Sequence, residues 1–302
     1  MRSTGYGSVQ TTAIGVMAVL LAAACWATSG IFVNLILAGS RVSTLALAFW
    51  RDIIGFTIFF ILALYFDHRQ LGIRPKDRFP IAGMGISLGI FHVVLNLGYQ
   101  MNGIAITTIL QTIMPAIVLI ASRIIWKEPL TGLKILSLIL ICAGTVLVTG
   151  LLQANTPEIT ILSILVGLMI PILYAGWSLF GKALRSGYSA VITLSWAFGI
   201  AALILLPCQL YTGNFFPGMV PVSTVLWFCG LIFISTIGGF FTFTFALGKL
   251  PASVATVLIM TEIPFAVGYA YFIFGEVLSM GNIIGALLIV TGVASISLQP
   301  KG

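Results

Sequence analysis

Residues 105–150 read AITTILQTIMPAIVLIASRIIWKEPLTGLKILSLILICAGTVLVTG, and residues 253–297 read SVATVLIMTEIPFAVGYAYFIFGEVLSMGNIIGALLIVTGVASIS. Each stretch is an apolar run with a proline in its middle, a glutamate at its end and then a second apolar run. The matched pairs are Pro115 and Pro264, Gly132 and Gly281, Glu128 and Glu276, and Gly144 and Gly292. An internally duplicated apolar sequence is typical of membrane transporters built from repeats.

The composition excludes a water-soluble fold. The chain has 302 residues, of which 60% are hydrophobic and 7% are charged, whereas soluble domains carry about 25% charged residues. We therefore predict an integral membrane protein. The four cysteines lie inside apolar runs without C-x-x-C spacing, which predicts no disulfide framework, no metal site and no cofactor.

The apolar runs are long enough for helices that cross a membrane. They predict ten spans, at residues 12–37, 42–66, 80–100, 104–126, 132–152, 159–181, 188–210, 222–247, 252–274 and 281–298. Barrel strands would be shorter and strictly alternating. The predicted fold class is an all-α membrane protein.

Basic residues predict the orientation of these helices, because cytoplasmic loops are rich in Lys and Arg. With a cytoplasmic N-terminus, the following residues fall at cytoplasmic ends: Arg2, Arg69, Arg74, Lys76, Arg78, Arg123, Lys127, Lys134, Lys182, Arg185, Lys249 and Lys301. Arg41 lies at an outside end and Arg51 lies within a span. We expect both termini in the cytoplasm, a lipid bilayer around the chain and no nucleic-acid partner.

The odd number of spans in each half predicts inversion. If residues 1–152 and 153–302 each form a five-helix repeat, the second repeat enters the membrane upside down relative to the first. Such inverted halves form a substrate site at their interface and support alternating access. We expect spans 1, 3, 4, 6, 8 and 9 to line that site, and spans 5 and 10 to form peripheral support.

The whole chain resembles ten-helix, EamA-like members of the drug/metabolite transporter superfamily. The resemblance rests on the duplicated block, on residues 26–30 (WATSG) and on residues 49–51 (FWR). Within the superfamily the chain looks closest to YddG-type aromatic amino acid exporters. The resemblance implies an exporter of amino acids, aromatic and other neutral ones among them. We expect a monomer in the bacterial inner membrane.

Polar side chains in the middle of spans are candidate substrate contacts, because they are costly in a membrane. His92, Asn96 and Tyr99 share one face of span 3, and Gln111 lies in span 4 with two neighbouring threonines. Either they line a cavity, or they make a polar contact between helices.

Two prolines in the middle of spans predict paired bends. Pro115 in span 4 and Pro264 in span 9 each remove a backbone hydrogen bond from their helix. The bends either gate the cavity in each half or are static features of packing.

Charged groups at depth leave several alternatives open. Glu262 binds a substrate ammonium, carries a coupling proton or pairs with another buried charge. Arg51 and Asp52 are helix neighbours and cannot form an i,i+4 pair, so each needs another partner. Arg51 forms either a structural salt bridge or a clamp for a substrate carboxylate. Glu128 and Glu276, at the turns before spans 5 and 10, are expected to be structural.

Aromatic side chains lie deeper than the membrane interface, where a belt of such residues would be found. Trp26, Tyr174 and Trp177 either pack between helices or form a broad apolar chamber suited to neutral amphipathic solutes. A P-loop, a G-x-S-x-G motif and an H-E-x-x-H motif are all missing from the sequence, so we expect no enzyme. An exporter of other metabolites or drugs is the alternative, and an intramembrane enzyme is a remote one.

Overall fold

The computed structural model describes residues 9–67, 71–151, 160–213, 221–275 and 277–297, and every regular element in these ranges is a helix. In the first half these are α1 (Val9–Ala27), α2 (Ser29–Gly39), α3 (Thr44–Phe66), the 3-10 turn η2 (Pro75–Asp77), α4 (Arg78–Gln111), α5 (Met114–Ile125) and α6 (Gly132–Val148). In the second half they are α7 (Ile161–Leu184), α8 (Ala190–Thr212), α9 (Val222–Gly230), the π-helix η3 (Leu231–Gly239), α10 (Phe240–Leu247), α11 (Ala252–Leu258), the 3-10 turn η4 (Ile259–Thr261), α12 (Glu262–Phe274) and α13 (Met280–Ser297).

These helices form the predicted membrane spans. Eight stretches are long and apolar enough to cross a bilayer, and the shorter apolar helices Gly132–Val148 and Met280–Ile296 supply the fifth and tenth spans. Many large aliphatic side chains remain exposed on the outside of the bundle, among them Ile120, Leu162 and Leu203. Such exposure is stable in contact with lipid chains.

The chain reverses between the third and fourth spans at Gly103, inside α4. Its φ of 74° and ψ of 168° are not helical. A side chain rarely tolerates this backbone conformation, which glycine adopts without steric cost.

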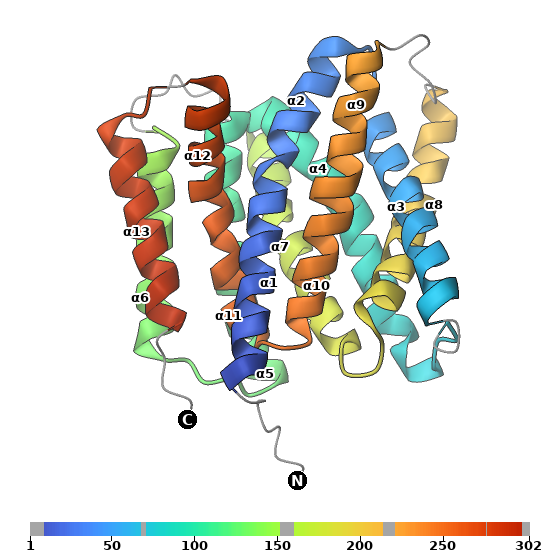
Figure 1. The fold of residues 1–302 in the computed structure, drawn as a ribbon, viewed down its shortest axis with the longest axis horizontal. Coiled ribbons are helices and arrows are strands. Elements are labelled where there is room, and N and C mark those ends of the chain that lie inside the picture. The colour runs from blue at the N-terminus through green and yellow to red at the C-terminus, as the bar shows by residue number, and fades with distance from the viewer. Residues whose placement is uncertain (1–8, 68–70, 152–159, 214–220, 276, 298–302) are drawn as a thin grey trace.

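The two halves cross the bundle in opposite directions. In Figure 1, α1 begins and α13 ends at the lower end, whereas α6 ends and α7 begins at the upper end. The lower end is called the basic end here, because it carries Arg123, Lys182, Arg185 and Lys249. The predicted boundary between residues 152 and 153 lies outside the described residues and stays a prediction.

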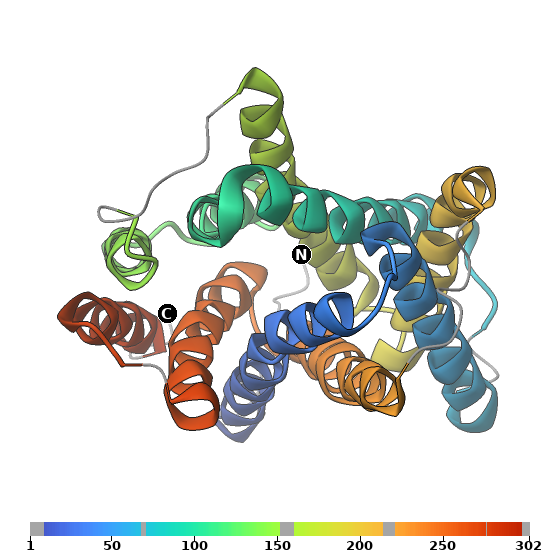
Figure 2. The same cartoon turned by 90° about the horizontal axis from the view of Figure 1, so that it is seen from above.

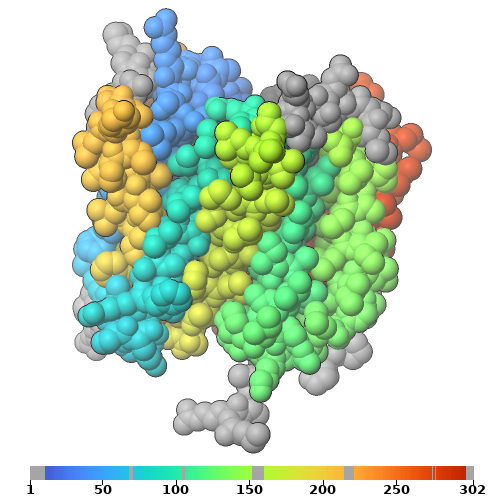
Figure 3. All heavy atoms as spheres, turned by 180° about the vertical axis from the view of Figure 1, so that it is seen from behind, coloured from blue at the N-terminus to red at the C-terminus, as the bar shows by residue number. Residues whose placement is uncertain are grey.

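Contacts between the halves follow a two-fold pattern. α1 packs on η3 and α10, α4 on α7, α3 on α8, α5 on α11, and α6 on α13. Seen from the upper end in Figure 2, the α6–α13 and α3–α8 pairs flank a central group of helices. Figure 3, from behind, shows α4 running between α7 and α8, on both of which it packs.

The pair of α6 and α13 is peripheral, as predicted for spans 5 and 10. A Cβ on Gly144 would lie 2.5 Å from the carbonyl oxygen of Gly285, and a Cβ on Gly285 would lie 2.5 Å from that of Gly144. The backbones therefore touch, as small residues allow in membranes. Gly132, at the start of α6, makes no such contact, because a Cβ there would meet nothing within 4 Å.

Candidate functional site: a central cavity

A cavity of about 620 Å³ lies between the two halves, within the usual size range of ligand sites. All the side chains that the sequence suggested as substrate contacts line it: Trp26, His92, Asn96, Tyr99, Gln111, Tyr174, Trp177 and Glu262. They come from spans 1, 3, 4, 6 and 9. Span 8 contributes Phe240, as expected. The cavity is also lined by Arg51 of span 2, Val148 of span 5 and Asn282 of span 10, so the expected set of lining spans was incomplete.

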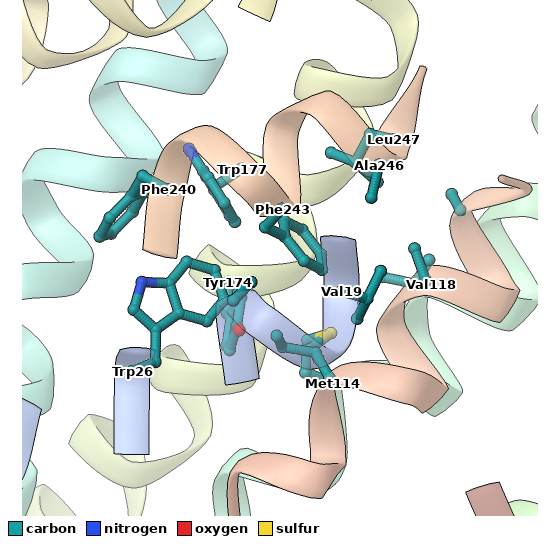
Figure 4. Packing of buried hydrophobic residues seen from close by; sticks show 14 of the residues in the cluster. Val19, Trp26, Met114, Val118, Tyr174, Trp177, Phe240, Phe243, Ala246 and Leu247 are labelled. Carbon is teal, nitrogen blue, oxygen red and sulfur yellow. The ribbon is translucent and has the colours of Figure 1, made fainter. Parts of the chain in front are cut away.

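The cavity extends toward the upper end of the bundle in Figure 1. Its lining there includes Asn34 near the end of α2, Thr149 after α6 and Asn282 at the start of α13. Toward the basic end, the side chains beneath it are apolar and fully buried, including Val118 and Phe243. Figure 4 shows this layer packed between helices of both halves. The cavity is therefore closed toward the basic end.

Four aromatic side chains, here called the aromatic floor, form the deep end of the cavity: Trp26, Tyr174, Trp177 and Phe240. The Trp26 ring centroid lies 5.0 Å from that of Phe240 and 5.8 Å from that of Trp177, both edge-on. Figure 4 shows Trp26 facing the other three. Such edge-to-face contacts hold the rings rigidly. The sequence alone did not separate Phe240 from the other phenylalanines of span 8.

Arg51 enters the cavity wall from α3. Its Nε donates a 2.9 Å hydrogen bond to Thr236 Oγ1, and its guanidinium carbon lies 5.5 Å from the Phe240 ring centroid. The Thr236 hydroxyl itself donates to the Leu231 carbonyl within the π-helix, so its lone pairs are free to accept. Within the described ranges, none of the ion pairs involves Arg51.

Glu262 is placed by an interrupted helix. It is the first residue of α12, directly after the 3-10 turn that ends at Thr261. Its side chain lines the cavity and makes no hydrogen bond or ion pair with any other described residue. Glu262 and Arg51 are close enough to interact electrostatically.

Asp52, unlike its neighbour Arg51, points away from the cavity to a buried partner. His92 Nδ1 of α4 lies 2.8 Å from Asp52 Oδ1, with the two side chains 3% and 0% exposed. Both expectations for His92 are therefore met, because it lines the cavity and also joins two helices. This pairing could not be predicted from the sequence, because the two residues lie on different helices.

Both predicted helix interruptions are present. α4 ends at Gln111 and α5 begins at Met114, so Pro115 lies in the first turn of the new helix. In the other half, the turn η4 separates α11 from α12, just before Pro264. Neither proline lines the cavity. Their role in gating stays a prediction.

A buried ionic cluster, here called the Glu128 latch, joins the halves at the basic end. Glu128, 4% exposed, accepts hydrogen bonds from the Ala252 N–H at 3.1 Å, the Ser253 N–H at 3.4 Å and the Ser253 hydroxyl. Lys134 Nζ donates to Ser253 Oγ at 2.8 Å and lies 4.0 Å from Glu128. Glu128 thus binds the start of α11 in the other half, while Thr131 caps α6. The matching Glu276 lies outside the described residues.

Inverted helical halves around a central cavity define a membrane transporter. The sequence profile of the EamA-like transporter family matches residues 13–150 and 161–298, and the chain belongs to this family. An uncharacterised transporter of Archaeoglobus fulgidus is 24% identical over 83% of this chain and 88% of its own length. A crystal structure aligned over 97% of this chain and 98% of its own length has a TM-score of 0.78 at 19% identity, which shows the fold alone.

Proposed function

We propose that this transporter exports neutral amino acids, aromatic ones among them, by alternating access. One observation carries the proposal: Arg51 and Glu262 line the same cavity as the aromatic floor. A guanidinium binds a carboxylate through paired hydrogen bonds. A carboxylate binds an ammonium group. The cavity thus offers one partner for each charge of a zwitterion.

The rest of the lining matches the side chain of such a substrate. The faces of Trp26, Trp177 and Phe240 provide flat apolar surface for an aromatic or aliphatic group. Asn96 and Gln111 add neutral hydrogen-bonding groups. A phosphorylated substrate fits this site poorly, because Arg51 is the one Lys or Arg side chain in the described lining.

The direction of transport follows from the orientation that the basic residues predict. If the basic end faces the cytoplasm, the cavity is open to the outside. This outward-open conformation is the one that releases an exported solute. An impermeant thiol reagent applied to intact cells tests this orientation. It should fail to label Arg74→Cys, and labelling would place the basic end outside.

The substrate proposal is tested by uptake into proteoliposomes with three matched compounds. Phenylalanine carries both charges, phenethylamine lacks the carboxylate and 3-phenylpropionate lacks the ammonium. We expect rapid uptake of phenylalanine alone, in unchanged chemical form. Equal uptake of all three would overturn the zwitterion site and favour a general metabolite or drug exporter.

Two variants connect this selectivity to the cavity. Glu262→Gln and Arg51→Lys should each weaken phenylalanine binding about tenfold or more, since a hydrogen bond to a charged group contributes about 1.5–3 kcal/mol. Arg41→Lys is the matched control, because Arg41 is exposed and lies outside the cavity lining. Wild-type affinity in both cavity variants would remove the charge partners from the proposal.

A further inference from the structure

The pair of Asp52 and His92 lies directly behind the cavity wall. Both carboxylate oxygens of Asp52 and both ring nitrogens of His92 are buried, and none of them makes a hydrogen bond of good geometry, although Asp52 Oδ1 and His92 Nδ1 lie 2.8 Å apart. Unpartnered buried polar atoms are costly and call for an explanation. Because the imidazole of His92 lines the cavity, a ligand for its Nε2 would arrive from there.

The contact with Asp52 decides which nitrogen of His92 is available. An ionised carboxylate only accepts hydrogen bonds, so the 2.8 Å contact between Asp52 Oδ1 and His92 Nδ1 favours the tautomer with its hydrogen on Nδ1. Nε2 of the neutral ring then has a lone pair and no hydrogen. A carboxylate that fixes the tautomer of a histidine in this way sets which ring atom reacts.

The charges around the pair favour one added positive charge. Arg51 on α3 and Glu262 on α12 line the cavity, and Asp52 adjoins it. One guanidinium and two carboxylates leave one negative charge uncompensated. The rings packed on His92 from α8 and α10, Phe198 and Phe240, carry no charge. The other titratable side chains in the lining are the phenols of Tyr99 and Tyr174.

We propose that the Asp52–His92 pair is the binding site of a proton that is exchanged for the amino acid. The proposal rests on the zwitterion site described above. The lone pair of Nε2 either holds a proton or accepts a hydrogen bond from the substrate ammonium, because it cannot do both. Substrate and proton are therefore mutually exclusive at this atom.

This exclusion produces antiport. At the cytoplasmic side, the amino acid binds, and the proton leaves Nε2 for cytoplasmic water. At the outer side, the amino acid leaves, and Nε2 takes up a proton from outside water. Each cycle moves one amino acid out and one proton in, so that an inward proton gradient drives export. Chains of Asp, Glu and His commonly carry protons in membrane transporters.

Proteoliposomes with a trapped pH indicator test the exchange. An outward phenylalanine gradient should acidify the interior of vesicles that contain the wild-type chain. His92→Gln should lose this proton movement. Asp52→Asn should lose the proton movement too. Asp67→Asn, which alters the residue just after the same helix and away from the cavity, should keep it. Phenylalanine flux without proton movement in the wild-type chain, or proton movement in His92→Gln, would overturn the proposal.

A spectroscopic readout covers the case in which a pair variant fails to fold. The chain has 2 histidines, so in the His68→Gln variant every ring signal in a ¹⁵N-histidine NMR spectrum comes from His92. Without substrate, this ring should change protonation state as the pH is lowered, and added phenylalanine should shift it toward the neutral form. A constant signal would overturn the proton site. Absence of any amino acid flux together with a titrating His92 would overturn the proposed substrate instead.

Discussion

Replacing Glu128 by glutamine is expected to open the basic end of the cavity more often. In the closed state, the Glu128 carboxylate accepts three hydrogen bonds from the start of α11 and lies 4.0 Å from Lys134 Nζ. Glutamine keeps one carbonyl oxygen and loses the charge. In the open state water would solvate either side chain, so the substitution destabilises the closed state relative to the open state.

The size of the effect follows from these contacts. The loss of one hydrogen bond to a charged group costs about 1.5–3 kcal/mol, and Lys134 is left without its carboxylate, which adds to the cost. Since about 1.4 kcal/mol corresponds to a tenfold change in an equilibrium constant, the population of the open form should rise about tenfold to a hundredfold.

Thiol labelling in detergent measures this population. In a chain without native cysteines, Ala246→Cys places a thiol in the fully buried apolar layer under the aromatic floor (Figure 4). Adding Glu128→Gln should raise its labelling rate by the same factor. The control Arg123→Gln removes an exposed charge near the same end and should leave the rate unchanged. An unaltered rate in a well-folded Glu128→Gln chain would refute the latch as a gate.

Three further outcomes are expected. Pro115→Ala and Pro264→Ala should let the backbone N–H bond to the preceding turn, join the helices across each interruption and slow flux more than they lower folded yield; wild-type flux in both would exclude a hinge role. Trp177→Ala should change the ranking of amino acids in a competition assay, because it widens the aromatic floor; an unchanged ranking would contradict that role. Gly144→Ala should lower the melting temperature, since its Cβ would lie 2.5 Å from a carbonyl oxygen of α13, whereas Gly132→Ala, with open space around it, should not.

The positions of the spans could be predicted closely, because apolar length is a local property of the sequence. The interruptions near Pro115 and Pro264 were predictable for the same reason, since proline removes a hydrogen bond from its own helix. Polar and aromatic residues at depth, such as Asn96 and Trp177, were also found by position alone. Because the membrane penalises polar groups, these residues tended to face the cavity.

The electrostatic partners could not be predicted. Asp52 contacts His92 on another helix, and Arg51 donates to Thr236 of the other half. Glu128 looked like a local feature of the turn before span 5, yet it binds the start of α11. No spacing within one helix encodes such pairs, because they depend on how distant helices are rotated and placed.

A helical membrane protein with two duplicated and inverted halves can be predicted from the chain alone, since hydrophobicity and repetition are visible in it directly. The folded arrangement was needed to show that Arg51 reaches the cavity, that Asp52 points behind it to His92, and that the basic end is closed. Those features arise from packing between the halves, where residues far apart in the chain come within hydrogen-bonding distance.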